Sequence, residues 1–223
     1  MEKKKQILNR IKLVITLLLI LLGAGMILNP WLRALYFNMM QRSLLNEWES
    51  PSQVKSWTES SATISMNSDE FSVWEEDVNP SINVRQLAKD IGGIITIEKV
   101  NIKAPIITKH TASNLNISVC EVIPSRAMGQ PGNYVLAGHR SRVYGRHFNR
   151  INELEAGDIV IVEDRSHRYE YQVEDVFIVS ADQVTVMDND GDRKLITLIT
   201  CDYTTNPASR LIVRGELTNE TVK

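Results

Sequence analysis

Residues 194–201 read KLITLITC and residues 210–217 read RLIVRGEL, and these two stretches decide the fold. Both are rich in Leu, Ile, Val and Thr, as β-strands are. Thr205, Asn206 and Pro207 form a turn-like segment between them. The stretches therefore predict two β-strands, with Cys201 at the end of the first and Arg210 at the start of the second.

Similar strand signals occur through the C-terminal part of the chain, separated by Gly, Asn, Asp and Pro turns. They lie at residues 94–97, 104–107, 133–138, 158–162 and 169–179. An apolar stripe over residues 84–91 predicts an amphipathic helix that stops at Gly92 and Gly93, and a second short helical segment lies at residues 148–154. About eight short strands with few helices predict a mainly β domain over residues 83–223, either a closed eight-stranded barrel or a sandwich.

The N-terminal part of the chain predicts a membrane anchor. Residues 1–12 carry five Lys or Arg and one Glu, and residues 13–32 (LVITLLLILLGAGMILNPWL) carry no charge. A helix of that length spans the roughly 30 Å of a bilayer core. The positive-inside rule then makes residues 1–12 a cytoplasmic tail and places the remainder outside a single-pass cell membrane anchor. The alternative is a cleaved signal peptide, which the long apolar run disfavours.

Residues 33–82 connect the predicted anchor to the β domain. Their first part keeps helical spacing toward Trp48, which predicts a juxtamembrane helix. Residues 50–69 are rich in Ser, Thr and Asn and have little apolar surface to bury. They predict a flexible stalk.

Composition argues against two kinds of partner. The net charge is -2 at pH 7, so there is no positive excess to neutralise a phosphate backbone, and we expect no nucleic-acid partner. The sequence contains neither a CxxC nor an HExxH motif. The acidic run at residues 188–192 fails the spacing of a calcium loop and reads as a solvated turn. We therefore expect no metal and no cofactor.

Cys201 and His139 each end an apolar strand, where two strand tips can bring a thiol and an imidazole together for nucleophilic catalysis. Only a few per cent of an ordinary thiol is ionised at pH 7, and the cation Arg210 would favour the thiolate. On spacing alone the alternatives are a buried cysteine, a turn histidine and a surface arginine. The remaining histidines, His110, His147 and His167, are assigned no role.

A family resemblance adds to this pattern. The string TLITC at residues 197–201, RLIVRGEL after it and Ala-Gly-His at residues 137–139 resemble the sortases, which are membrane-anchored cysteine transpeptidases of Gram-positive bacteria. The resemblance covers roughly residues 83–218. It implies an eight-stranded β-barrel with the active site at one end.

The resemblance also implies a role for each matching residue. Cys201 would attack the carbonyl between Thr and Gly of an LPXTG-like sorting signal, His139 would transfer protons, and Arg210 would bind the substrate and the oxyanion. The resulting thioester would pass the surface protein to the amine of a cell-wall precursor. The residues implied to border the substrate groove are Ala137, Leu198, Ile199 and Thr200.

Some features of the chain leave the assignment open. No transmembrane segment follows residue 217 and no Asp-Pro-aromatic lid precedes the barrel, which favours class A over the pilin-polymerising sortases, while the residues around His139 and Cys201 keep class D as the alternative. Cys120 has no family role and reads as a buried thiol. Two other functions remain: a papain-like peptidase, which usually places its Cys before its His, and a non-catalytic extracellular sensor or scaffold.

Overall fold

The computed structural model divides the chain into two compact units, Met1–Met39 and Met40–Lys223. It describes residues 12–17, 23, 32, 35–36, 38–49, 84–140, 147–202 and 209–223. The predicted stalk at 50–69 and most of the predicted anchor at 13–32 lie outside these residues. Within the described part, no helix is both long and apolar enough to cross a bilayer.

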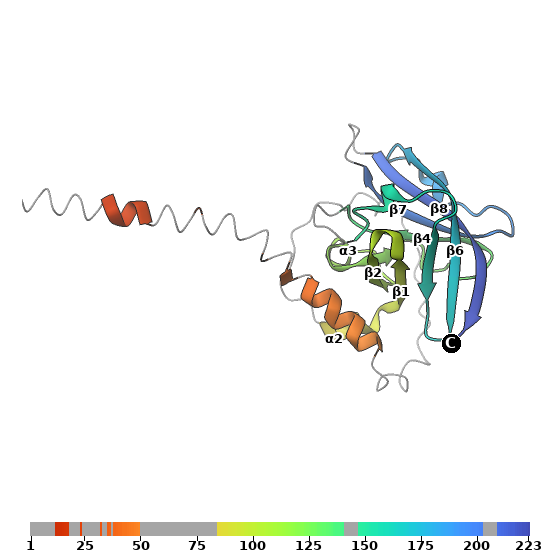
Figure 1. Cartoon of the computed structure of the whole chain (residues 1–223), viewed down its shortest axis with the longest axis horizontal. Helices are drawn as coiled ribbons and strands as arrows, with labels where there is room; N and C mark the ends of the chain where they lie inside the picture. The colour runs from red at the N-terminus through yellow and green to blue at the C-terminus, as the bar shows by residue number, and fades with distance from the viewer. Residues whose placement is uncertain are drawn as a thin grey trace, which may run out of the picture. The chain divides into compact units, whose positions relative to one another are not determined.

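Eight strands close into a barrel in the order β1-β2-β3-β4-β7-β8-β6-β5 (Figure 1). Their bounds are β1 Ile91–Ile97, β2 Ile102–Ile107, β3 Val119–Glu121, β4 Gly132–Ala137, β5 Ile159–Glu163, β6 His167–Val179, β7 Lys194–Asp202 and β8 Ser209–Val222. The predicted closed barrel is confirmed, and the sandwich is excluded. The three-residue strand β3 was not predicted.

Short helices connect the strands. They are α2 Val84–Lys89, η3 Glu98–Val100, α3 Ala112–Ile117, η4 Ile151–Glu153 and η5 Val184–Met187. The prediction that a helix runs to Gly92 was wrong, because Ile91, Gly92 and Gly93 belong to β1. Gly93 has to be a glycine there, since a Cβ atom would lie 2.4 Å from the Glu163 carbonyl oxygen on β5.

Residues 38–49 are helical, as the spacing toward Trp48 predicted. Leu44 is fully buried, and Glu49 Oε1 lies 2.9 Å from Lys103 Nζ. The Arg165 guanidinium lies 3.6 Å from the centre of the Trp48 ring. Residues 40–49 therefore belong to the same unit as the barrel, although the sequence analysis placed them in a separate connecting segment.

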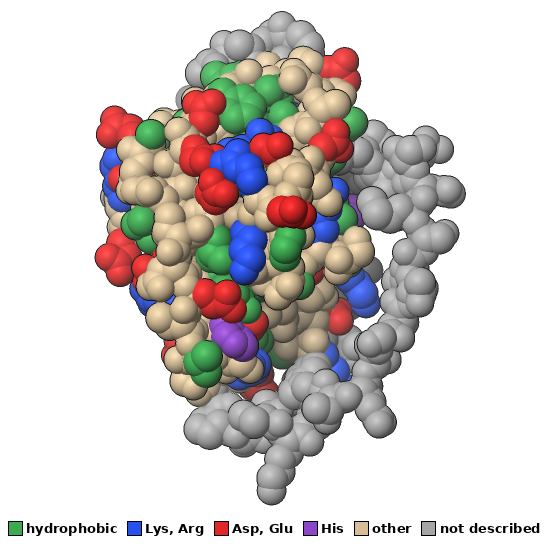
Figure 2. Space-filling model, turned by 90° about the vertical axis from the view of Figure 1, so that its right-hand side faces the viewer, with side chains coloured by type: hydrophobic (Ala, Val, Ile, Leu, Met, Phe, Trp, Pro, Cys, Tyr) green, Lys and Arg blue, Asp and Glu red, His purple; other side chains and the backbone are tan. Residues whose placement is uncertain are grey.

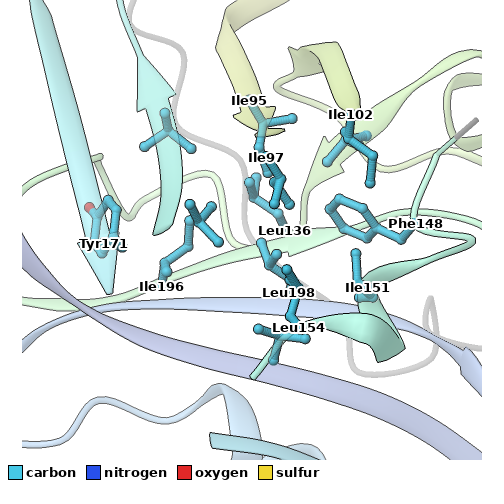
Figure 3. Close-up of a cluster of buried hydrophobic side chains, with 14 of the residues drawn as sticks. Ile95, Ile97, Ile102, Leu136, Phe148, Ile151, Leu154, Tyr171, Ile196 and Leu198 are labelled. Carbon is cyan, nitrogen blue, oxygen red and sulfur yellow. The ribbon is translucent and has the colours of Figure 1, made fainter. Parts of the chain in front are cut away.

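The barrel core consists of inward-facing aliphatic and aromatic side chains (Figure 3). Alternate residues of β4 and β7 point into it, among them Leu136, Ile196 and Leu198. Phe148, Ile151 and Leu154 also belong to the core. Of the helical segment predicted at residues 148–154, only Ile151–Glu153 is helical. Because alternate residues face inward, the intervening residues of β4 and β7 face outward.

Two of the barrel's strand pairs are parallel, β2 with β3 and β4 with β7. Parallel neighbours need a crossover connection. α3 supplies it for β2 and β3, and the chain through β5 and β6 supplies it for β4 and β7. Since parallel strands end at the same edge, the carboxyl ends of β4 and β7 lie side by side.

Positive and negative side chains are mixed on the face of the molecule drawn in Figure 2. Among the ion pairs of the barrel, Arg193 makes three, with Glu174, Asp190 and Glu216. This face thus carries no broad basic patch of the kind that binds a phosphate backbone.

Candidate active site

The register of β4 and β7 brings the predicted histidine and cysteine to one place. Ala137 pairs with Ile199, and the Gly138 amide donates a hydrogen bond to the Ile199 carbonyl at 3.1 Å. His139 and Cys201 each lie two residues beyond the paired Ala137 and Ile199. Residues at equivalent positions of parallel strands project from the same face, so a β4 backbone that stays extended to His139 would direct the imidazole to the face of Cys201.

Arg210 lies directly opposite Cys201 in the antiparallel pair of β7 and β8. Directly opposed residues have Cβ atoms about 5 Å apart on the same face. The Arg210 side chain is 9% exposed and its Nη1 donates to the Ser209 carbonyl at 3.3 Å. Cys201 is half-buried, and a permanent cation opposes it in the strand ladder.

The two strand ends are held together by more than the backbone ladder. Thr200 Oγ1 donates a hydrogen bond to the Gly138 carbonyl at 2.7 Å. Gly138 also packs against Phe148, and a Cβ atom at Gly138 would lie 2.8 Å from Phe148 Cδ2. The glycine between Ala137 and His139 is therefore required by close packing, which fixes the backbone that carries His139.

A shallow groove lies beside β7 and β8. Ile199, Ile212 and Arg210 form its floor, and the segment between β6 and β7 forms its wall with Val184, Val186 and Met187 among others. The groove is thus mostly apolar, with the Arg210 guanidinium at the same strand position as Cys201. Its apolar lining is of the kind that contacts apolar side chains of a ligand.

The wall of the groove is fixed by polar contacts with the strands. Asn133 Nδ2 donates to the carbonyls of Val186 and Asp188, both at 3.1 Å. Arg214 Nη2 donates to the Val186 carbonyl at 2.7 Å. These bonds attach the segment to the first residues of β4 and to the middle of β8.

The structure separates the four residues implied to border the groove. Ile199 lines it, and Ala137 lies on the same outer face through its pairing with Ile199. Leu198 is fully buried in the barrel core (Figure 3), so it packs inside instead of lining the groove. Thr200 is also fully buried, and its hydroxyl bonds Gly138. The cause is the two-residue period of the strand, which turns both residues away from the face of Cys201.

Comparison with known proteins identifies the family. A model of the sortase domain matches residues 95–218. Sortase A of Listeria monocytogenes is 27% identical over 207 residues, which make up 93% of this chain and 91% of that protein. Sortase A of Bacillus anthracis is 33% identical over 148 residues, 66% of this chain and 68% of the relative. The chain belongs to the sortase family.

Solved sortase structures have the same fold. The crystal structure of Listeria monocytogenes sortase A superimposes with a TM-score of 0.57 and 30% identity, over 60% of this chain and 91% of that one. Clostridium perfringens sortase C, solved with its C-terminal cell wall sorting motif, gives a TM-score of 0.53 and 27% identity, over 58% and 71%. This sortase is therefore a cysteine transpeptidase, and the papain-like peptidase and the non-catalytic scaffold are excluded.

The surroundings of His139 include residues that the sequence analysis did not single out. The His147 ring meets the His139 ring edge-on, with the ring centres 6.2 Å apart. His147 is buried and has a φ of 50°, a left-handed conformation that is uncommon outside glycine. Arg140, which follows His139, makes an ion pair at 2.8 Å with Asp202, which follows Cys201. The sequence did contain a signal for this ion pair, because Arg140 directly follows His139 and the oppositely charged Asp202 directly follows Cys201.

A second buried polar cluster lies on β3 of the sortase barrel. The Tyr134 hydroxyl donates a hydrogen bond to Glu121 Oε1 at 2.7 Å, and Glu121 is 8% exposed. Burial raises the pKa of the Glu121 carboxyl to about 7, against a smaller lowering by the Tyr134 hydrogen bond. Burial also raises the pKa of the neighbouring Cys120 thiol well above its ordinary value. Cys120 is thus kept as an unreactive thiol.

The described residues hold no group of three His, Cys, Asp or Glu side chains placed to bind a metal ion. In the acidic run between β6 and β7, Asp190 makes an ion pair with Arg193 at 3.1 Å. The Asp190 carboxylate is thus paired with the Arg193 guanidinium.

Proposed function

We propose that Cys201, His139 and Arg210 form the active site of this sortase, and that it cleaves LPXTG-like sorting signals between Thr and Gly. The observation that carries the proposal is the strand register. It pairs Ala137 with Ile199, each two residues before His139 or Cys201, and opposes Cys201 to Arg210 across β7 and β8.

In the first half-reaction, the Cys201 thiolate adds to the Thr carbonyl carbon of the signal. The carbonyl oxygen becomes an oxyanion, which the Arg210 guanidinium stabilises with directional N–H donors. The Thr–Gly C–N bond then breaks as the His139 imidazolium gives its proton to the departing Gly amine. The products are a thioester on Cys201 and a peptide with a free N-terminal glycine.

In the second half-reaction, the amine of a cell-wall precursor attacks the thioester. Neutral His139 accepts the proton that the amine loses, a new amide bond forms, and the Cys201 thiolate leaves. The thioester keeps enough free energy for this second acyl transfer, so that no further energy source is required. The surface protein ends attached to the precursor.

Residue positions around the triad support a binding mode for the signal. An extended peptide on the outer face of β7 and β8 would place its apolar Leu and Pro in the groove by Ile199 and Ile212. Its Thr carbonyl would then lie toward Cys201 and Arg210 at the strand ends. We propose Ala137 and Ile199 as the substrate-contacting residues, with Thr200 acting through Gly138.

The proposed activity also requires a particular location of the protein in the cell. We propose that residues 13–32 anchor the protein in the cell membrane, with the N-terminus cytoplasmic and the barrel outside, where sorting signals and cell-wall precursors meet. Protease added to intact Gram-positive cells that express the protein should then degrade the barrel and spare the first residues. Protection of the barrel would contradict this topology.

Between the two classes, we propose class A, since the likeness to a sortase A extends over 93% of the chain.

The proposed active site is tested by peptide transfer in the full-length chain. An LPXTG peptide with a reporter on its N-terminal side should be joined to triglycine by the wild type. Cys201→Ala and His139→Ala should each lower transfer by about a thousandfold or more. The matched controls Cys120→Ala and His167→Ala should keep transfer within about threefold of the wild type. Cleavage retained by Cys201→Ala, or a comparable loss in either control, would contradict the assignment.

A further inference from the structure

The residues that follow His139 and Cys201 bind each other on the opposite side of the barrel wall. Arg140 Nη1 donates to Asp202 Oδ1 at 2.8 Å. The Asp202 side chain is 2% exposed and that of Arg140 is 17% exposed, so water screens this pair little. The ion pair therefore joins the ends of β4 and β7 at the level of the two reactive residues.

Arg140 has a second contact that fixes its direction. Its Nη2 donates to Asn152 Oδ1 at 3.2 Å, and Asn152 belongs to η4. One guanidinium thus holds the end of β7 with one nitrogen and η4 with the other. A planar fork with both nitrogens engaged permits little rotation, unlike a single point contact.

We propose that the Arg140–Asp202 ion pair is a positioning device for catalysis, which sets the separation of the His139 imidazole from the Cys201 thiol. This inference rests on the proposed roles of His139 and Cys201. Each partner of the pair is the chain neighbour of one reactive residue, so a change in their distance moves the imidazole and the thiol relative to each other. A displacement of about 1 Å between reacting groups costs about a hundredfold in rate.

The backbone ladder alone does not hold the chain at His139 and Cys201 in place. The ladder between β4 and β7 ends at Ala137 and Ile199, before the reactive residues are reached. Beyond it, the bonds of Gly138 to the Ile199 carbonyl and to Thr200 Oγ1 hold the backbone one residue short of His139. The Arg140–Asp202 ion pair joins the two strands beyond these bonds.

The test is a double-mutant cycle in the full-length chain with the variants Arg140→Met, Asp202→Asn and both together. Each single variant should lower kcat for peptide transfer about a hundredfold, with KM within about twofold of the wild type, because the groove residues are unchanged. The double variant should be no worse than the worse single variant, since the link is already lost. Additive losses, or an unchanged kcat in both single variants, would overturn the proposal.

A control separates positioning from loss of stability. Arg193 makes an ion pair at 2.7 Å with Glu216 where β7 begins, at the other end of the same strand. Arg193→Met should keep kcat within about twofold. Arg140→Lys, which keeps the charge but not both contacts of the fork, should restore only part of the transfer lost in Arg140→Met. A loss in Arg193→Met as large as in Arg140→Met at equal thermal unfolding midpoints would overturn a specific positioning role.

A second readout separates positioning from an effect of charge on the thiol. In Arg140→Met the Asp202 carboxylate is left without this cation, which disfavours the Cys201 thiolate and slows its alkylation by iodoacetamide at pH 7. In Asp202→Asn the Arg140 charge is left without this anion, so alkylation should be faster. Positioning predicts that kcat falls in both variants although the alkylation rates move in opposite directions. If kcat follows the alkylation rate in each variant, the pair acts through charge and the proposal fails.

The proposed function can be checked separately in the same experiment. A wild-type chain that forms no thioester, or a Cys201→Ala variant that still transfers peptide, would contradict the active site itself. A wild type that transfers and an Arg140→Met variant that transfers equally well would contradict the positioning role alone.

Discussion

Cys120 lies within the barrel wall on β3, whereas Cys201 lies at the end of β7 beside Arg210. The two positions are linked through β4, because Cys120 opposes Ala137 and Ala137 pairs with Ile199, two residues before Cys201. Cys120 is nevertheless fully buried, and its Sγ lies 4.0 Å from the Ser118 carbonyl oxygen. Cys201 is half-buried and opposes a guanidinium. We therefore expect the same side chain to be inert at the first position and reactive at the second.

The largest expected difference is in the alkylation of the two thiols. Iodoacetamide should modify Cys201 in the folded protein, while Cys120 should react about a thousandfold or more slowly, because it is exposed only by an opening that costs about 4 kcal/mol or more. Peptide mapping after timed alkylation gives both rates in one sample. Equal alkylation rates for the two thiols would show that the barrel opens readily around β3. In denaturant, the difference between the two rates should disappear.

The region around Cys120 should also give stability a specific dependence on pH. The Glu121 carboxyl has its pKa raised to about 7 by burial, from an ordinary value of 4.5. Between these values the native state binds more protons than the unfolded state, so this group's contribution to stability is complete below about pH 4.5 and is lost as the pH rises through about 7. Relative to Glu121→Gln, the wild type should lose about 3 kcal/mol of unfolding free energy over that range.

The measurement is denaturant unfolding of both proteins at several pH values between 4 and 8. A control variant, Glu155→Gln, changes a carboxyl that is 83% exposed and should follow the wild-type curve. Parallel curves for the wild type and Glu121→Gln would mean that the Glu121 carboxyl stays ionised in the folded protein.

The region around Cys201 should be sensitive to the shape of its cation. Arg210→Lys keeps the positive charge opposite Cys201 but loses the fork of N–H donors, so we expect kcat/KM for peptide transfer to fall about thirtyfold with little change in unfolding free energy. Arg168→Lys, at a half-buried position on β6 where the side chain pairs with Glu170, is the matched control. If Arg210→Lys transfers peptide at nearly the wild-type rate, then Arg210 contributes only its positive charge, and its directional N–H donors are not required.

The smallest expected effect is a loss of stability without a loss of activity. Cys120→Ser places a hydroxyl in a fully buried site and should lower the unfolding free energy by about 1 to 2 kcal/mol. Peptide transfer per folded molecule should not change, because Cys120 takes no part in it. A large fall in transfer with unchanged stability would assign Cys120 a place in the active site.

The sequence predicted the parts of the fold that depend on local pattern. Seven of the strands have apolar runs bounded by turn residues, and the barrel and the reactive residues at strand ends followed from them. β3 was missed because three residues carry no periodic signal, and its parallel pairing with β2 depends on the crossover through α3. Gly92 and Gly93 suggested a helix end, but they provide the close approach between β1 and β5.

The candidate site was predictable to the extent that it depends on motifs. The two-residue period of TLITC already implies that Ile199 shares a face with Cys201 and that Leu198 and Thr200 do not. The Arg140–Asp202 ion pair could not be predicted, because its partners are 62 residues apart and meet only through the register of β4 and β7. The edge-on contact between His139 and His147 likewise requires the folded backbone.

The most direct test of the account is the intact mass of the full-length protein mixed with an LPXTG peptide without an acceptor amine. We predict a single acyl adduct, mapped to Cys201, which disappears when triglycine is added as the transpeptidation product forms. No adduct in the wild type, or an adduct that maps to Cys120, would contradict the assignment of Cys201 as the nucleophile.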